Sequence, residues 1–428
     1  MYTLITLLFI AGYAAIAFEH PLKINKTASA LLTGVLCWVV YIMGTSNTEL
    51  VSEQLYEHIG QISGILFFLL GAMTIVELID AHDGFEVITS RITTKDKRKL
   101  LWIISLVAFF LSAVLDNLTT TIVMVSLLRK LITDKETRLF YVGMVVIAAN
   151  AGGAWTPIGD VTTTMLWIGG QITTGNIMLK LFLPSMACII VPLILLSFRI
   201  KGKIENNTVV EVTKDTNPTS AFERKLILGL GIGALVFVPV FKTVTHLPPF
   251  LGILFGLGVL WVVTELIHKN KNDADKDVYS VVHALRKADT PSVLFFLGIL
   301  VAIAALESTH LLSDLAVYMD KTIGNINVIV ISIGLLSAII DNVPLVAATM
   351  GMYDMQTYPT DHYFWEFIAY CAGTGGSCLI IGSAAGVAAM GMEKIDFFWY
   401  AKRIAGLALL GYFAGALVYM AQHYFLHL

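Results

Sequence analysis

Long apolar runs alternate with short polar segments along all 428 residues of the chain. Each run is long enough for a helix to cross a hydrocarbon core of about 30 Å, which takes roughly 20 apolar residues. The pattern predicts an all-α integral membrane protein, with spans at about 2–18, 28–45, 62–81, 139–170, 178–199, 226–244, 249–267, 291–310, 365–390 and 397–425.

Two further apolar stretches, at about 100–132 and 325–352, are too long for one helix and are interrupted by Asp116-Asn117 and Asp341-Asn342. Lys and Arg crowd both flanks of the first stretch, whereas the flanks of the second hold one lysine and several aspartates. Basic flanks stay on the cytoplasmic side of a membrane. We therefore expect two re-entrant helical hairpins, one entering from each membrane face.

The remaining charges predict the topology. Basic loops near residues 23–26, 199–225 and 269–287 fall on the cytoplasmic side if both termini lie outside. The loop that holds Glu49, Glu53 and Glu57 has no Lys or Arg and is expected outside. The polar, turn-rich stretch at 201–222 is interpreted as a cytoplasmic linker between two halves, 1–200 and 223–428.

The two halves share weak but ordered sequence similarity. Leu115-Asp116-Asn117 recurs as Ile340-Asp341-Asn342, and Gly152-Gly153 followed by Ile158-Gly159 recurs as Gly375-Gly376 followed by Ile381-Gly382. Each predicted half has five spans and one hairpin, and an odd number of crossings turns the second half upside down in the membrane. This inverted repeat, with a hairpin and a broken helix in each half, is typical of secondary transporters.

Composition supports the membrane assignment and excludes other classes. Charged residues make up 14% of the chain, against about 25% in soluble proteins. The net charge of −3 gives no indication of nucleic-acid binding. The four cysteines lie in apolar stretches without metal-ligand or disulfide spacing. We expect a transporter, not an enzyme, with no cofactor and the lipid bilayer as its surroundings.

Four points in the apolar stretches carry Gly, Pro, Asn, Thr and acidic residues: 116–121, 150–160, 341–344 and 373–377. Irregular backbone at membrane depth must line a cavity or be buried in protein. Unwound segments present the oxygen ligands that sodium prefers. Desolvation favours the protonated form of a buried carboxyl group, whereas a bound cation favours the ionised form. Competition between proton and cation for Asp116 and Asp341, assisted by Asp160, would couple their movements.

Each aspartate also has a purely structural interpretation. Asp116, Asp160 and Asp341 can cap the N-terminus of a helix with a side-chain oxygen. The threonines at 162–164 can satisfy helix backbone. Capping and ion binding are compatible, so both interpretations stand at this stage.

The strings LDNLTTTIV (115–123) and NAGGAWTPIGDVTTTMLW (150–167) resemble the signature segments of NhaD-type sodium/proton antiporters. That family belongs to the ion transporter superfamily, together with arsenite permeases and divalent-anion/sodium symporters. The resemblance extends over essentially the whole chain in span order. It implies electrogenic exchange of cytoplasmic Na⁺, often Li⁺ too, for external H⁺ across the cell (inner) membrane, a role in pH homeostasis, and a homodimer.

The resemblance also implies a site. In the dicarboxylate transporters of the superfamily, paired hairpin tips and the adjacent broken helices bind sodium. Here an aspartate replaces the tip serine in both halves, which suits cation/proton exchange. The first half is richer in polar residues and is expected to hold the main Na⁺ site, at Asp116, Asn117 and Asn150, with a further set at Asp341 and Asn342. The full candidate set is Asp116, Asn117, Thr119, Thr120, Asn150, Thr156, Asp160, Asp341, Asn342, Thr374 and Ser377.

Two other functions remain open. An anion permease for arsenite or carboxylates would need positive charge or amide dipoles at the site, yet the broken points carry three acids and no Lys or Arg. An intramembrane aspartyl protease would use Asp116 and Asp341 but would not need an asparagine after each aspartate. The sequence therefore favours a Na⁺(Li⁺)/H⁺ antiporter.

Overall fold

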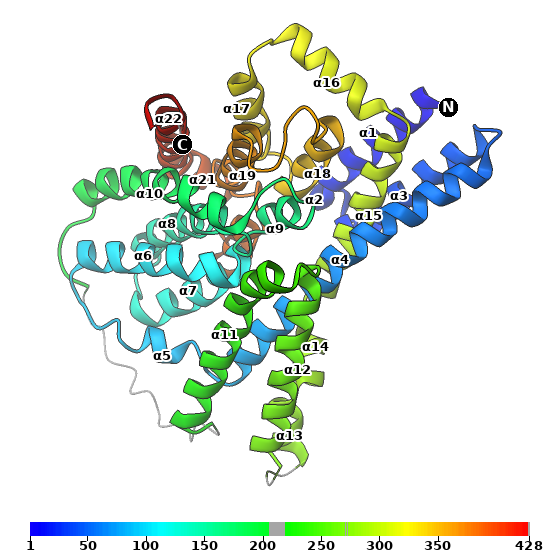
Figure 1. The fold of residues 1–428 in the computed structure, drawn as a ribbon. Coiled ribbons are helices and arrows are strands. Elements are labelled where there is room, and N and C mark those ends of the chain that lie inside the picture. Colours follow the sequence, from blue (N-terminus) through cyan, green and yellow to red (C-terminus); the bar gives the residue numbers. More distant parts are fainter. Residues whose placement is uncertain (205–218, 270, 272, 427–428) are drawn as a thin grey trace.

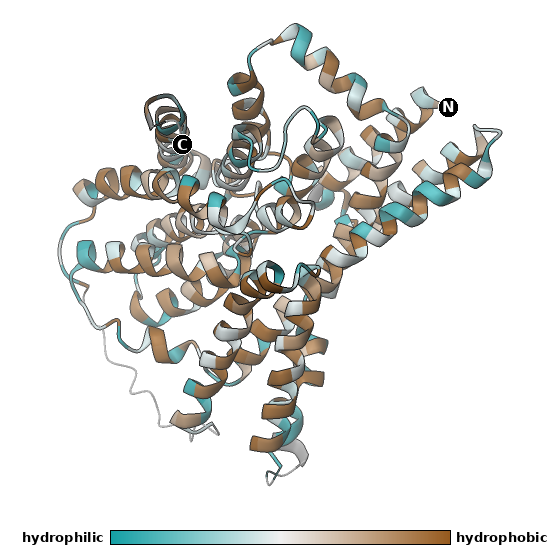
Figure 2. Cartoon of the chain, viewed as in Figure 1, coloured by the Kyte–Doolittle hydropathy of each residue, from teal (hydrophilic) through white to brown (hydrophobic). Residues whose placement is uncertain are grey.

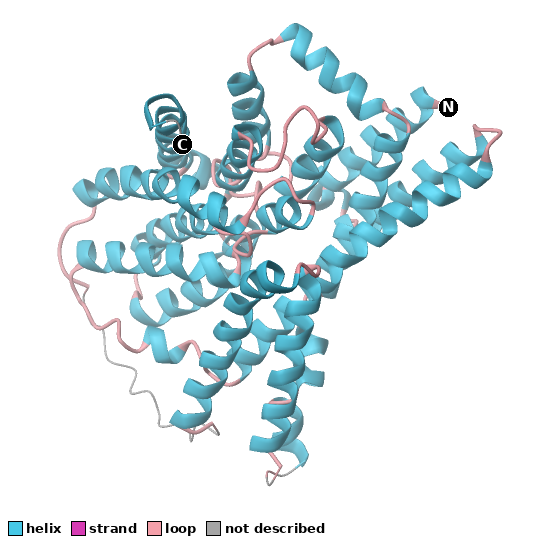
Figure 3. Cartoon of the chain, in the orientation of Figure 1, coloured by secondary structure: helices cyan, strands magenta, loops and turns pink. Residues whose placement is uncertain are grey.

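The computed structural model describes residues 1–204, 219–269, 271 and 273–426. Within these residues the regular structure is helical and no strand forms (Figure 3). Nine of the described helices are long and apolar enough to cross a membrane. They are α3 (Lys26–Met43), α4 (Thr48–Ala81), α6 (Lys97–Leu115), α8 (Lys135–Ala154), α10 (Thr174–Arg199), α11 (Ala221–Thr245), α12 (Pro249–Ile267), α15 (Thr290–Ser308) and α22 (Ala405–Leu426).

The outer faces of these helices are apolar. Along α11 and α12, hydrophobic residues cover most of the helix length, and polar residues gather near the ends (Figure 2). On α12, the side chains of Phe255, Val262 and Leu266 are each at least 60% exposed. Exposure of so much apolar surface to water would be costly. The fold therefore confirms the prediction of a multi-pass helical membrane protein.

Both long apolar stretches are divided into two helices at the residues where the sequence predicts an interruption. Helix α6 ends at Leu115, and α7 (Asn117–Leu131) begins two residues later. In the second half, α17 (Ile326–Leu336) is followed by α18 (Asn342–Met352). Asp116, at the first junction, has a φ of 103°, a backbone conformation that residues with a Cβ rarely adopt and that concentrates at functional sites. The entry of the two hairpins from opposite membrane faces stays a prediction.

Two predicted spans are likewise interrupted. Helix α8 ends at Ala154 and α9 (Val161–Ile168) continues after a break at 155–160. Helix α19 (Tyr363–Gly375) and α20 (Ala384–Glu393) enclose a second break at 376–383. The last turns of α8 and α19 are completely buried. The two breaks therefore lie inside protein, where their free backbone groups can find partners.

The same contacts hold each hairpin against its broken helix in both halves. The Ser112 hydroxyl donates a hydrogen bond to the Ala149 carbonyl at 2.6 Å, and the Ser337 hydroxyl donates to the Ala372 carbonyl at 2.8 Å. A Cβ added to Gly152 would lie 2.2 Å from the Phe109 carbonyl oxygen, and one added to Gly375 would lie 1.9 Å from that of Gly334. Such close backbone crossings require glycine.

Helices of the two halves interlock at the centre of the molecule. Helix α8 packs on α6, α7 and α10 of its own half and on α19 and α20 of the other. Helix α20 packs on α7, and α18 packs on α9. A second group, formed by α1 (Tyr2–Ala17), α3, α4, α11, α12 and α15, lies to one side (Figure 1). It meets the first group where α15 contacts α18, α4 contacts α9 and α11 contacts α6. The centre of the interlocked group is where all four helix interruptions meet.

Two details of the predicted spans are wrong. Helix α4 begins at Thr48, not near 62, so Glu49, Glu53 and Glu57 lie on a helix and not in a loop. The Asn47 side chain caps this helix by accepting a hydrogen bond from the Leu50 amide, and Glu49 lies in its first turn, which favours an early start. The single span predicted at 397–425 is divided at Ile404 into α21 (Phe397–Arg403) and α22.

Segments expected as loops also form short helices. These are α2 (Glu19–Leu22), α5 (Glu86–Thr89), α13 (Asp273–Val278), α14 (Val281–Lys287) and α16 (Leu311–Thr322). The predicted linker at 201–222 overlaps the start of α11 at Ala221, and its residues 205–218 lie outside the described part of the chain.

Candidate functional site

Four short helices start at the interruptions, and each begins with a polar cap. The carboxylates of Asp116, Asp160 and Asp341 accept hydrogen bonds from the first-turn amides of α7, α9 and α18 at 2.7, 2.9 and 3.2 Å. The Ser383 hydroxyl oxygen accepts from the Gly386 amide of α20 at 3.2 Å. The capping interpretation of the three aspartates is therefore confirmed. In Asp160 and Asp341 it uses only one of the two carboxylate oxygens.

Asp160 connects the first residues of α7 and α18. Its Oδ1 caps α9 and also accepts a hydrogen bond from the Thr162 hydroxyl at 3.0 Å. Its Oδ2 accepts from the side-chain amides of Asn117, at 2.9 Å, and Asn342, at 3.4 Å. The side chain of Asp160 is almost fully buried. The charge of one carboxylate is thus shared by amides that come from the two halves of the chain.

Asn150 makes a second connection between the halves. Its Oδ1 accepts a hydrogen bond from Asn117 Nδ2 at 2.9 Å. Its own Nδ2 donates to the hydroxyl oxygens of Ser377, at 2.8 Å, and Ser383, at 2.9 Å. Asn150 is fully buried, and a buried amide is costly unless its polar atoms are paired. The network from Ser377 through Asn150 and Asn117 to Asp160 is therefore a single hydrogen-bonded unit.

Asp116 belongs to the same region but has different partners. Both of its carboxylate oxygens are occupied by Thr119, whose amide donates at 2.7 Å and whose hydroxyl donates at 2.9 Å. Asp116 borders the same cavity as Asp160. Its partners are neutral donors, so its charge in the ionised state is not balanced by an ion pair in the described structure.

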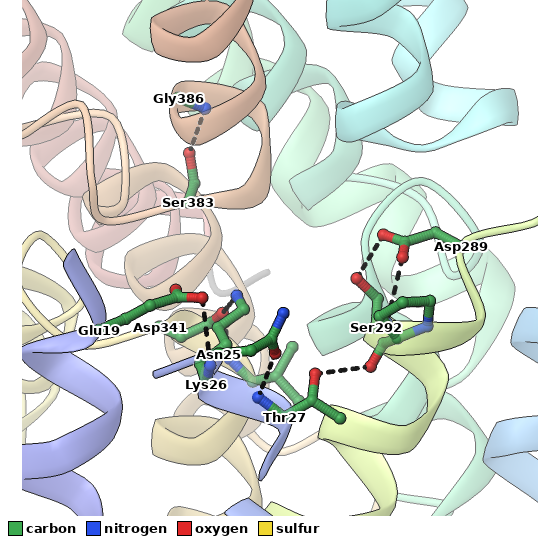
Figure 4. A network of polar contacts seen from close by, with 11 residues as sticks. Glu19, Asn25, Lys26, Thr27, Asp289, Ser292, Asp341, Ser383 and Gly386 are labelled. Atoms are coloured by element: carbon green, nitrogen blue, oxygen red, sulfur yellow. Dashed lines mark hydrogen bonds and ion pairs between the residues drawn. The ribbon is translucent and has the colours of Figure 1, made fainter. Parts of the chain in front are cut away.

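Asp341 has a cationic partner that the sequence interpretation missed. The Lys26 ammonium group, at the start of α3, lies 3.5 Å from Asp341 Oδ2. In Figure 4 the Asp341 carboxylate turns toward Lys26, with Glu19 beside them. The sequence predicts only that Lys26 lies in a basic cytoplasmic loop. Counts of charged residues indicate the side of the membrane on which a lysine lies, but they do not identify its partner elsewhere in the chain.

A cavity of about 60 Å³ lies between these groups. Asp116, Asn117, Asp160, Asp341 and Asn342 line it together with apolar side chains, among them Phe68 and Phe296. One water needs about 10–15 Å³ of such volume, so the cavity has room for a small cation with a few waters. Within the described residues, no group of three or more His, Cys, Asp or Glu side chains is placed to hold a metal ion. The available ligands are mixed carboxylate and amide oxygens, as a hard monovalent cation prefers.

The remaining candidates lie nearby, with different roles. The hydroxyl groups of Thr156 and Thr374 donate to the carbonyls of Ala113 and Tyr370 at 2.7 and 2.6 Å, so they satisfy helix backbone. The Thr120 hydroxyl is buried without a hydrogen-bond partner in the described structure. Ser377 accepts from Asn150, as described above.

Ser383 is a network residue that the sequence interpretation missed. It follows Ile381-Gly382 in the same way that Asp160 follows Ile158-Gly159, so extending the repeat alignment by one residue would have found it.

Comparison with known proteins places these residues in context. A model of the citrate transporter family matches residues 13–370. The chain is 54% identical to sodium/proton antiporter 1 of Arabidopsis thaliana over 97% of this chain and 72% of that protein. It is 51% identical to sodium/proton antiporter 2 of the same plant, over 98% of this chain and 99% of the relative. It is 30% identical to the Na⁺/H⁺ antiporter NhaD of Vibrio cholerae, over 97% and 90% of the two chains.

Proposed function

Because the chain belongs to the NhaD-type sodium/proton antiporters, within the family described as citrate transporters, we propose that it exchanges Na⁺ for H⁺ across a membrane. The finer proposal is that cytoplasmic Na⁺, and Li⁺ as well, leaves in exchange for external H⁺. The proposed setting is the cell (inner) membrane, with both termini outside and two copies forming a homodimer.

The observation that carries the proposal is the position of Asp160 Oδ2, buried between the amides of Asn117 and Asn342 at the edge of the cavity. Without a cation, these amides donate their N–H groups to the carboxylate. An asparagine side chain also carries a carbonyl oxygen. Turning either amide over would present that oxygen to a cation held by Asp160. The same residues can therefore serve the empty and the cation-bound site.

Asp116 supplies the second negative charge to the proposed site. Two ionised carboxylates in a cavity lined largely by apolar side chains are unfavourable without a compensating positive charge. Either a proton or an alkali cation provides that charge, and the two exclude each other. Their competition is the coupling step that we propose for exchange.

We also propose that the two halves form an inverted repeat in the membrane. The paired contacts of Ser112 with Ala149 and of Ser337 with Ala372 support an equivalent construction of both halves. In an electrogenic cycle, each net charge moved is worth about 2.3 kcal/mol per 100 mV of membrane potential. A potential that is negative inside would then drive sodium extrusion.

An anion permease is the second candidate, favoured by the description of the matching family and by the presence of Lys26 in the cavity wall. The charge balance opposes it. The cavity carries three aspartates against this one lysine, and Asp341 already pairs with the lysine. An oxyanion would meet net negative charge, so the cation remains the better occupant.

The test is a transport assay in everted membrane vesicles from cells that lack their own sodium extrusion. We expect addition of Na⁺ or Li⁺ to dissipate a preformed pH gradient, and Asp116→Ala to abolish the response. Asp134→Ala is the matched control, because Asp134 caps α8 at an exposed position. Full exchange by Asp116→Ala, or a response to citrate or arsenite but not to Na⁺ or Li⁺, would overturn the proposal.

A further inference from the structure

The two hairpin-tip aspartates, Asp116 and Asp341, occupy aligned positions but differ in their surroundings. Thr119 satisfies both carboxylate oxygens of Asp116. Asp341 instead uses Oδ1 to accept the Val343 amide and turns Oδ2 toward Lys26. Of the side chains that line the cavity in the described part of the chain, only Lys26 is cationic. In the described part of the chain, the tip aspartate of the second half therefore has a cationic partner, supplied by α3 of the first half, whereas Asp116 has only neutral partners.

The base of the Lys26 side chain is held from several directions. The Asn25 side chain caps α3 by accepting a hydrogen bond from the Thr27 amide at 2.8 Å. The Lys26 amide donates to the Glu19 carboxylate at 3.1 Å, and the Thr27 hydroxyl donates to the Pro291 carbonyl at the start of α15 at 3.0 Å (Figure 4). These contacts fix the start of α3 against Glu19 and the start of α15. They hold the Lys26 side chain at the wall of the cavity.

The far end of the side chain is equally confined. The ammonium group lies 4.5 Å from the centre of the Phe295 ring, at a cation–π distance, as well as 3.5 Å from Asp341. The side chains of Lys26 and Asp341 are only 31% and 20% exposed. Charges that are partly withdrawn from water are screened much less than charges on an open surface. A free alkali cation beside Asp341 would therefore meet strong repulsion unless Lys26 withdrew.

We propose that Lys26 is a tethered cation that occupies Asp341 in place of a transported ion and so confines alkali-cation binding to the site around Asp160 and Asp116. This inference rests on the proposed function and specifies its site. The chain then holds one exchangeable Na⁺, and the second half contributes Asn342 to that ion while its own carboxylate is already neutralised. Removal of the lysine charge opens a second position for a monovalent alkali cation at Asp341.

The experiment measures bound ²²Na⁺ per chain by equilibrium dialysis of the purified full-length protein at fixed pH. We expect one Na⁺ in the wild type and two in Lys26→Met, which keeps an unbranched side chain one atom shorter but removes its charge. The matched control is Lys23→Met, since Lys23 is an exposed lysine three residues upstream. It should bind one Na⁺. In the double variant Lys26→Met/Asp341→Asn the second Na⁺ should disappear.

Asp341→Asn alone keeps the test decisive if Lys26→Met does not fold. We expect this variant to bind one Na⁺ still, but with at least about tenfold weaker affinity, because the unpaired ammonium group now repels the cation in the same cavity. A single Na⁺ in folded Lys26→Met, or complete loss of Na⁺ binding in Asp341→Asn, would overturn the inference. If the wild type neither binds nor exchanges Na⁺, the proposed function fails instead, so the two failures are distinguishable.

Discussion

Asn117 Nδ2 lies 2.9 Å from Asp160 Oδ2 and donates a hydrogen bond to it. The first residue comes from the tip of a hairpin and the second from the break in a span. The same nitrogen also donates to Asn150, which in turn donates to Ser377 and Ser383. The Asp160 carboxylate is therefore linked to these two serines through the side chains of Asn117 and Asn150. The predictions below follow from this network, from an ion cluster around Glu393 and from a pair of histidines.

Asp160→Asn should weaken cation binding while preserving the fold. The asparagine oxygen can still accept the Thr162 amide and cap α9, but the negative charge beside the cavity is gone. Loss of a charged ligand is worth about 2 kcal/mol, so we expect the Na⁺ concentration for half-maximal exchange to rise at least about 30-fold. The measurement is a Na⁺ titration of pH-gradient dissipation. Asp134→Asn should leave the titration unchanged, and equal curves for both variants would contradict the assignment.

Asn150→Ala should destabilise the protein. The change removes the buried hydrogen bonds that Asn150 makes with Asn117, Ser377 and Ser383, and one such loss costs about 1–3 kcal/mol. We expect a decrease of about 3 kcal/mol in the free energy of unfolding, measured by denaturant titration in detergent. Asn47→Ala, which removes the cap of α4 at an exposed site, should cost about 1 kcal/mol. An effect of Asn150→Ala no larger than that of its control would rule out a cooperative network.

An ion cluster around the buried Glu393 connects the end of α20 to α7 and α8 of the first half. Glu393 is almost fully buried, and its two oxygens lie 2.6 Å from Arg129 Nε and 3.0 Å from Arg138 Nε. Removing one partner of a buried ion pair costs about 3–5 kcal/mol, and the partial exposure of Arg129 favours the lower end. Glu393→Gln should therefore lose about 3 kcal/mol of stability.

The matched control for this cluster is Glu265→Gln. Glu265 pairs with Lys276 at 3.3 Å, but both side chains are exposed, and exposed pairs contribute about 1 kcal/mol or less. The measurement is the melting temperature of each variant, and we expect that of Glu393→Gln to be clearly the lower of the two. Similar melting temperatures would mean that the Glu393 cluster does not stabilise the fold.

The histidine pair that joins the end of α4 to the end of α12 should make stability depend on pH. His82 Nε2 lies 2.9 Å from His268 Nε2, and His82 Nδ1 lies 2.8 Å from the Leu78 carbonyl, to which it donates. His268 follows the last residue of its spanning helix. Burial lowers its pKa to about 4, and the charges of Lys271 and His82 act in the same direction.

The direction in which stability changes with pH follows from the lowered pKa of His268. The unfolded chain takes up a proton on His268 near pH 6.5, whereas the folded chain does so only near pH 4. The stabilising effect of the neutral pair is therefore complete above about pH 6.5 and declines as the pH falls toward 4. Between pH 7.5 and 5, His268→Gln should lose less thermal stability than the wild type. The exposed His246→Gln should follow the wild type, and parallel profiles for all three proteins would refute the prediction.

Local sequence signals were sufficient for most of the spanning helices and for the four interruptions. Hydropathy sets the length of a span, and Gly, Pro and Asp-Asn pairs mark where a helix stops, so the junctions at Asp116 and Asp341 could be placed without a structure. The caps formed by Asp116, Asp160 and Asp341 could also be proposed, because an N-cap depends on residues two or three positions away. The acidic start of α4 was missed because hydropathy places more weight on charge than on helix capping.

Long-range partners could not be predicted in the same way. The pairing of Lys26 with Asp341 joins residues from opposite halves, and nothing within either segment specifies the other. Ser383, in contrast, could have been predicted, because the repeat alignment places it opposite Asp160. The sharing of one Asp160 oxygen by Asn117 and Asn342 depends on how two tips meet in space, which residue spacing along the chain does not encode.

That shared oxygen constrains how the protein can move. If one hairpin tip swung away from the other, at least one amide would leave the carboxylate and become an unpaired group in a largely dry interior. Both hydrogen bonds survive only in a displacement in which the two tips and the breaks they face move together. Any such movement relative to α3 would have to separate Lys26 from Asp341, so this ion pair would oppose it.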